Sequence, residues 1–154
     1  MKASGKHDRE GAAPCKEVAF VLDSAALLAY LRGEEGGAVV QRVLRQCQDC
    51  ETRAAIAAPA LLDAYAVAAR EAPALYEDLV PLIEQLPLDT HPVTSETARA
   101  VADLVAQEAG LTSDQATGLI LSSRNGATLV TADPGLANRD RVLYVGPRAG
   151  DPKR

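Results

Sequence analysis

The sequence predicts an α/β fold with a mainly parallel sheet of four to five strands flanked by helices. Short apolar runs alternate along the chain with longer stretches in which apolar residues recur every three or four positions. Such alternation favours parallel strands joined by helices that cover both faces of the sheet. The chain has 154 residues, 47% hydrophobic and 24% charged, which is typical of one globular domain with a substantial core.

Each expected element follows from its local pattern. Strands are expected at residues 18–22, 54–57, 88–90, 127–131 and 142–145, and helices at 24–32, 38–47, 59–71, 73–86, 95–107 and 113–124. Pro59 opens a helix, a position that proline favours because its missing N–H has no partner there. Pro87 ends the fourth helix, and Asn125 with Gly126 forms the left-handed stop of the sixth.

The two ends of the chain lack any apolar period. Residues 1–15 and 147–154 are therefore predicted to be disordered tails around one domain at 16–146. No run approaches the about 20 apolar residues that a membrane span needs, and the N-terminus lacks an apolar signal segment. We expect a cytoplasmic protein that does not associate with membranes.

Charge and aromatic content limit how the protein could bind nucleic acid. Its 16 basic and 21 acidic residues give a net charge of −5, the wrong sign for broad electrostatic binding. With four Tyr, one Phe and no Trp, stacking of bases on aromatic side chains is disfavoured. A metal-dependent nuclease remains compatible, because carboxylates around a divalent ion are neutralised once the metal binds.

Cys47 and Cys50 form a C-x-x-C motif, but zinc would need two further ligands. Only Cys15, His7 and His91 are available, without a second paired spacing. The odd number of cysteines, three, also argues against a disulfide framework. We expect ordinary thiols near a helix end.

Two acidic residues follow predicted strands. Asp23 comes directly after the run 18–22, and Asp133 stands two residues beyond Thr131, on the same face of that strand. Open α/β sheets bind ligands at the carboxyl ends of their strands, so the two acids indicate one acidic, metal-binding pocket. Each has a structural alternative: Asp23 as a helix cap, and Asp133 as the start of a Pro-Gly turn.

Asp63 and Asp114 complete a candidate set of four acids. Asp63 lies past the first turn of its helix and has only apolar residues three and four positions away. A buried carboxylate there would need a cation, and the alternative is a solvent-exposed face. Asp114 lies between Thr112 and Gln115, a capping-box pattern that explains it without catalysis. The site hypothesis therefore depends on the set rather than on any single acid.

These acids and their surroundings resemble the PIN-domain ribonucleases, in particular the VapC-type toxins of bacterial toxin–antitoxin pairs. The resemblance covers about residues 18–145 and implies a PIN-like three-layer sandwich. Residues 126–133 are similar to the family's strand with a Thr-x-Asp ending, and Asp63 falls where the family usually has a glutamate. The four matching segments, in order, are 21–29, 56–63, 110–114 and 126–133.

The resemblance implies a ribonuclease whose four acids are catalytic and hold Mg²⁺ or Mn²⁺, ions that prefer oxygen ligands. Asp63 would lie outside the inner ligands, and Ser24 and Thr131 would orient carboxylates or waters. It also implies an RNA substrate, a homodimer, and a small antitoxin that reaches into the acidic pocket with a basic residue. The implied inner metal ligands are Asp23, Asp114 and Asp133.

Two other functions stay open. A PIN-like scaffold that binds a partner without catalysis would suit the acidic balance and the aspartate at position 63. A magnesium-dependent phosphatase also has an acid after its first strand, but it needs a second Asp two residues later. This chain has Ala25 there.

Overall fold

The strands of the described chain form a five-stranded parallel sheet in the order β3-β2-β1-β4-β5. The computed structural model describes residues 17–49 and 51–148. The strands are β1 (Val18–Leu22), β2 (Arg53–Ala57), β3 (Leu88–His91), β4 (Thr128–Thr131) and β5 (Val142–Tyr144). The predicted α/β class and parallel sheet are confirmed.

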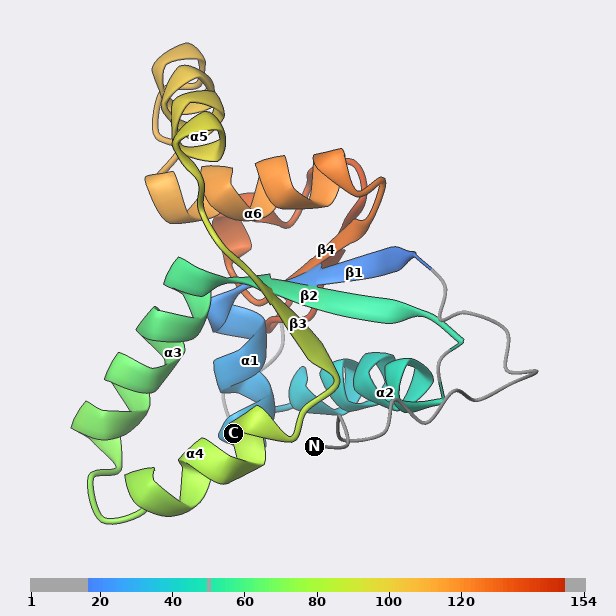
Figure 1. Cartoon of the computed structure of the whole chain (residues 1–154), viewed down its shortest axis with the longest axis vertical. Coiled ribbons are helices and arrows are strands. Elements are labelled where there is room, and N and C mark those ends of the chain that lie inside the picture. Colours follow the sequence, from blue (N-terminus) through green and yellow to red (C-terminus); the bar gives the residue numbers. More distant parts are fainter. Residues whose placement is uncertain (1–16, 50, 149–154) are drawn as a thin grey trace, which may run out of the picture.

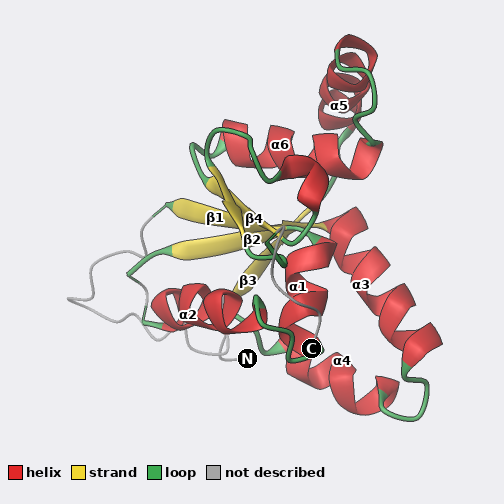
Figure 2. Ribbon diagram, turned by 180° about the vertical axis from the view of Figure 1, so that it is seen from behind, coloured by secondary structure: helices red, strands yellow, loops and turns green. Residues whose placement is uncertain are grey.

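Helices cover both faces of this sheet, which gives three layers (Figure 1). On one face lies α6, and α1 and α2 lie on the other; Figure 2 shows the same layers from behind. From the end of β2, α3 extends away and leads to α4, while α5 projects beyond α6. The helices are α1 (Ser24–Leu31), α2 (Gly37–Gln48), α3 (Ala58–Glu71), α4 (Tyr76–Glu84), α5 (Ser95–Gln107) and α6 (Ser113–Arg124), with a 3₁₀ turn η1 (Pro134–Leu136).

The central strand β1 is buried on both faces. Its Val21 belongs to the apolar cluster on the α6 side, together with Leu129 of β4. The next residue, Leu22, points the other way and packs with Val40 and Leu44 of α2. Successive strand residues face opposite sides, so a strand between two helical layers needs apolar residues at both. The continuous apolar run at 18–22 reflects this double burial.

One helix is shorter than predicted. The pattern at 73–86 predicts a single helix, whereas α4 spans Tyr76–Glu84. At its start, the Leu75 backbone N–H donates to the Ala72 carbonyl at 2.9 Å in a turn. At its end, Leu86 precedes Pro87, and a residue before proline is disfavoured in helical conformation.

Of the three cysteines, which are expected to be ordinary thiols, Cys47 lies in the described residues. Its side chain is buried in the cluster beneath α2, where it acts as a small apolar group. His7, Cys15 and Cys50 lie outside the described residues, as do the predicted tails except for residues 147–148. No helix in the two described ranges is both long and apolar enough to span a membrane.

Candidate active site

Three of the predicted acids line one cavity of about 160 Å³ at the carboxyl edge of the sheet, called here the acidic pocket. Asp23 comes from the end of β1, Asp133 from the loop after β4, and Asp114 from the first turn of α6. Pro59 and Ala60, in the first turn of α3, line the same cavity. The parallel order of β1 and β4 brings together acids that are far apart in the sequence.

Asp23 is a helix cap and also lines the acidic pocket. It is the N-cap of α1, and its Oδ1 accepts a hydrogen bond from the backbone N–H of Ala26 at 2.9 Å. Its Oδ2 accepts a hydrogen bond from the hydroxyl of Thr131 in β4. The cap fixes the carboxylate at the strand end, so the structural and the site interpretations of this residue are compatible.

Thr131 connects the two strand-end acids. It is fully buried, which is unusual for a hydroxyl, and both its donor and an acceptor position are used. The hydroxyl donates to Asp23, and it accepts a hydrogen bond from the backbone N–H of Asp133 at 2.9 Å.

Asp133 is held by two donors. Its Oδ1 accepts from the backbone N–H of Gly135 at 2.8 Å, as expected for the start of a Pro-Gly turn. Its Oδ2 accepts from the side-chain amide of Gln115 at 2.8 Å. The oxygen of that amide accepts from the backbone N–H of Thr112 at 3.0 Å, within the predicted capping box.

Sequence reasoning missed Gln115 as a member of the site. The capping-box pattern accounts for its contact with Thr112 but gives no signal for its bond to Asp133, 18 positions later. A Gln whose side-chain oxygen caps a helix still has an NH₂ group that can donate. This free donor is the signal in the sequence for a second partner of Gln115.

Burial raises the pKa of Asp23 from 3.8 to about 6. The hydrogen bonds from Thr131 and Ala26 lower this pKa, and the charge of Asp133 raises it further. The sequence predicts that, without metal, four close carboxylates repel one another and that at least one of them takes up a proton near neutral pH. In the structure, burial of Asp23 is the larger cause.

Asp63 does not join the other three acids. Its side chain is exposed on α3, and it does not line the acidic pocket. The expectation of a buried carboxylate on an apolar helix face is therefore wrong. The buried residues of α3 are Ala64 and Ala68, so Asp63 lies beside the packed stripe rather than in it. Its helical neighbours Pro59 and Ala60 reach the pocket, which places Asp63 about one turn beyond the rim.

The remaining predicted residues border the same cavity. Asp114 is exposed and accepts no hydrogen bond from the described residues. Ser24, at the start of α1, also lines the cavity. In the described ranges, no three Asp, Glu, His or Cys side chains are close enough to hold a metal ion together.

No family model and no curated protein sequence matches this chain. Solved structures do match it. A chain of a toxin–antitoxin complex from Klebsiella pneumoniae is 13% identical with a TM-score of 0.66, and the match covers 82% of this chain and 98% of that one.

Two further matches are chains of VapBC structures bound to DNA. The one from Salmonella typhimurium is 15% identical with a TM-score of 0.61, over 83% of this chain and 98% of that one. The one from Rickettsia felis, bound to a promoter fragment, is 10% identical with a TM-score of 0.59, over 82% and 97%. The fold of this chain is therefore similar to that of a chain of a toxin–antitoxin complex and of chains of two VapBC structures.

Proposed function

We propose that this chain is a divalent-metal-dependent endoribonuclease and the toxin of a toxin–antitoxin pair. One observation carries the proposal: Asp23, Asp114 and Asp133 come from three distant segments and line one pocket. The pocket lies where open parallel sheets bind ligands. Three carboxylates at one cavity favour a cation as the occupant.

The donor set suits Mg²⁺ or Mn²⁺ better than a softer metal. The three acids offer only oxygen, and the cavity of about 160 Å³ leaves room for water. Mg²⁺ commonly keeps several waters and uses one or two carboxylates, so it does not require three converging side chains. When bound, the ion would activate water and offset negative charge on the phosphoryl oxygens of the RNA.

Hydrogen bonds within the chain would orient the carboxylates that bind the metal. Thr131 and the N-terminus of α1 hold the Asp23 carboxylate in one orientation, and Gln115 with Gly135 holds that of Asp133. Carboxylates held in this way would position a bound cation with little reorganisation during the reaction. Asp114, whose exposed side chain lines the same cavity, would be a further oxygen ligand.

We also propose a cognate antitoxin and a homodimer. The structural neighbours are parts of toxin–antitoxin complexes. A basic side chain from an antitoxin would find three carboxylates in the acidic pocket, and the net charge of −5 would favour its approach.

The test uses purified, antitoxin-free protein, Mn²⁺ and a panel of labelled single-stranded RNAs. We expect cleavage that EDTA abolishes and that is lost in Asp114→Asn. Asp63→Asn is the matched control, because it removes the same charge from an exposed position outside the pocket. Cleavage that persists in Asp114→Asn would assign the activity to another site or to a contaminant.

A non-catalytic scaffold is the second candidate. It is favoured by the exposed position of Asp63, by the absence of a three-ligand metal group in the described residues, and by the acidic charge. Binding of an antitoxin without RNA cleavage under any metal condition would support it.

A phosphatase is less favoured, because Ala25 lines the pocket where that mechanism needs an acid. Turnover of a phosphate monoester without RNA cleavage would reverse this preference.

A further inference from the structure

A second cavity, of about 190 Å³, lies beside the acidic pocket and is called here the Arg124 pocket. The two cavities share Ala57 and Thr117, so they lie on either side of these residues. The Arg124 pocket has the opposite character: among the described residues, its lining includes no carboxylate. Its polar lining residues are His91, Thr97, Thr117, Arg124 and Asn125.

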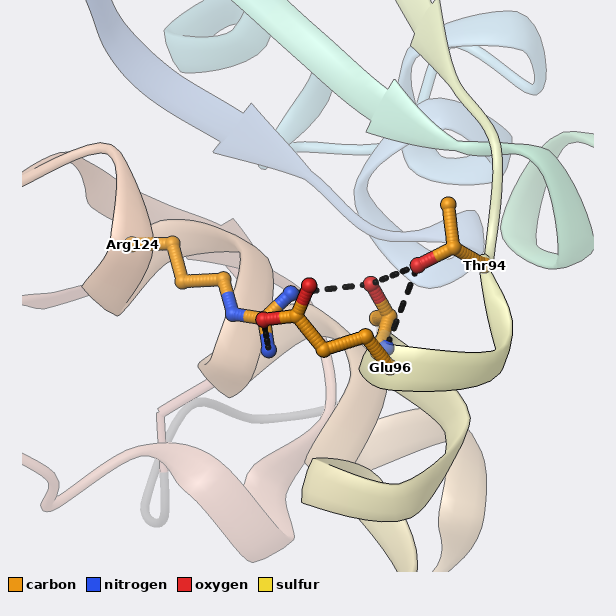
Figure 3. A network of polar contacts seen from close by, with 4 residues as sticks. Thr94, Glu96 and Arg124 are labelled. Carbon is orange, nitrogen blue, oxygen red and sulfur yellow. Dashed lines mark hydrogen bonds and ion pairs between the residues drawn. The ribbon is translucent and has the colours of Figure 1, made fainter.

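Arg124, at the end of α6, is held at this cavity by α5 (Figure 3). One guanidinium nitrogen, Nη1, donates to the hydroxyl of Thr97 at 2.9 Å. The other, Nη2, lies 3.4 Å from a carboxylate oxygen of Glu96. The Thr97 hydroxyl is itself 3.1 Å from that of Thr94, which caps α5. The guanidinium is therefore oriented by a short polar network before any ligand arrives.

This network leaves Arg124 able to bind an anion. A guanidinium has five N–H donors, and the two contacts use only part of them. The Glu96 side chain is 87% exposed, and such surface ion pairs contribute little. An incoming anion could replace Glu96 while the contact with Thr97 stays in place.

Other donors face the same space. His91 ends β3, and its imidazole carries at least one N–H in either protonation state. The side-chain amide of Asn125 donates one hydrogen to the Leu121 carbonyl at 2.8 Å and retains a second. A fixed cation with neighbouring neutral donors is the arrangement that binds phosphate.

We propose that the Arg124 pocket binds a backbone phosphate of the RNA, next to the phosphate that enters the acidic pocket. This inference rests on the proposed ribonuclease function and adds the subsite that positions its substrate. An RNA strand is repelled by a protein of net charge −5, so a local cation beside the reaction centre has a large effect on productive binding. Arg124 would thus be a positioning residue.

The first test needs no catalysis. Inorganic phosphate is titrated into the ¹⁵N-labelled full chain without added metal, and amide shifts are followed by NMR. We expect shifts around positions 91, 97 and 124–125, and about tenfold weaker binding in Arg124→Gln, as for loss of a charged hydrogen bond. Arg42→Gln, an exposed arginine on α2 across the sheet, should bind phosphate like the wild type.

Glu96→Gln should act in the opposite direction. Its carboxylate competes for the guanidinium, so phosphate binding should tighten about threefold. The control is Glu77→Gln, which removes an exposed charge from α4. Equal effects of Glu96→Gln and Glu77→Gln, or of Arg124→Gln and Arg42→Gln, would overturn the subsite. If Arg124→Gln does not fold, as judged by circular dichroism, Arg124→Lys keeps the charge and should still weaken binding.

The second test separates the subsite from the nuclease. With an RNA that the wild type cleaves, Arg124→Gln should raise KM with little change in kcat, unlike Asp114→Asn, which abolishes turnover. Phosphate binding at Arg124 without RNA cleavage would retain the subsite and reject the nuclease. Cleavage with the same KM in Arg124→Gln and Arg42→Gln would retain the nuclease and reject the subsite.

Discussion

The hydroxyl of Thr131 donates a hydrogen bond to the carboxylate of Asp23, 108 positions earlier in the chain, and joins the ends of β1 and β4. The same hydroxyl accepts from the backbone N–H of Asp133. Removal of the Thr131 hydroxyl deletes two hydrogen bonds at a fully buried position. It should therefore lower the free energy of unfolding more than removal of an ordinary surface hydroxyl does.

Thr131→Val should lower the free energy of unfolding by about 2 kcal/mol, because a buried N–H and a carboxylate lose their partner. The pKa of Asp23 should rise further, since the Thr131 hydrogen bond lowers it. Urea denaturation and NMR titration of Asp23 measure the two effects. Thr131→Ser keeps the hydroxyl and serves as the control. Equal effects on the pKa of Asp23 in both variants would show that the hydroxyl does not hold the acid.

The pKa of Asp23 predicts a pH dependence of stability. Because this pKa rises on folding from 3.8 to about 6, the folded state binds the proton more tightly than the unfolded chain does. The stabilisation by protonated Asp23 is therefore complete below about pH 4 and is lost as the pH rises through about 6, at a cost of about 3 kcal/mol.

Asp23→Asn cannot ionise, and asparagine is also a good N-cap. In the absence of metal, this variant should be more stable than the wild type at pH 7.5, and the difference should shrink toward pH 4. Urea denaturation at several pH values measures it. If the difference in the free energy of unfolding between the variant and the wild type does not depend on pH, ionisation of Asp23 does not destabilise the folded state.

Divalent metal should stabilise the folded protein if the acidic pocket binds it. Millimolar Mg²⁺ or Mn²⁺ should raise the Tm of the wild type, because a ligand of the native state stabilises that state. Asp114→Asn and Asp133→Asn should lose the shift, whereas Asp63→Asn should keep it because Asp63 lies outside the pocket. Differential scanning calorimetry gives the comparison. Loss of the shift in Asp63→Asn would place that acid near the metal.

Gly135 leaves room for the side chain that holds Asp133. A Cβ at this position would lie 2.8 Å from Nε2 of Gln115 and 3.1 Å from Oδ1 of Asp133. Gly135→Ala should therefore displace Gln115 and weaken the metal-dependent Tm shift, with a loss of stability below about 1 kcal/mol because both neighbours are side chains. If the effect acts through Gln115, it should vanish in a Gln115→Ala background. If the effects of Gly135→Ala and Gln115→Ala are additive, Gly135→Ala does not act through Gln115.

Local patterns were sufficient to predict much of this fold. The bounds of α5 and α6 agree with the sequence expectation, because Thr94 and Thr112 cap their first turns and Gly126, with φ of 60°, follows α6. Asp23 and Asp133 were predicted to reach one pocket because parallel strands end at the same edge.

Interactions between distant elements could not be predicted in the same way. The bond from Gln115 to Asp133 depends on how α6 lies over β4, which no local motif encodes. Asp63 was assigned to a buried face because its helical neighbours are apolar, yet α3 extends from the end of the sheet and packs through Ala64 and Ala68. Even Leu62 beside it is 69% exposed, so apolar composition alone overestimated burial on this helix.

The strand order has a consequence for the protein during its synthesis. β1 is made early, but one of its two neighbours in the sheet is β4, and the partner of Asp23 is supplied by Thr131. A growing chain that ends before β4 would therefore have Asp23 without Thr131, Asp133 or the second side of its sheet. Such long-range pairing is slow and is completed late in folding. The acidic pocket therefore cannot be complete until residues beyond Asp133 have emerged from the ribosome.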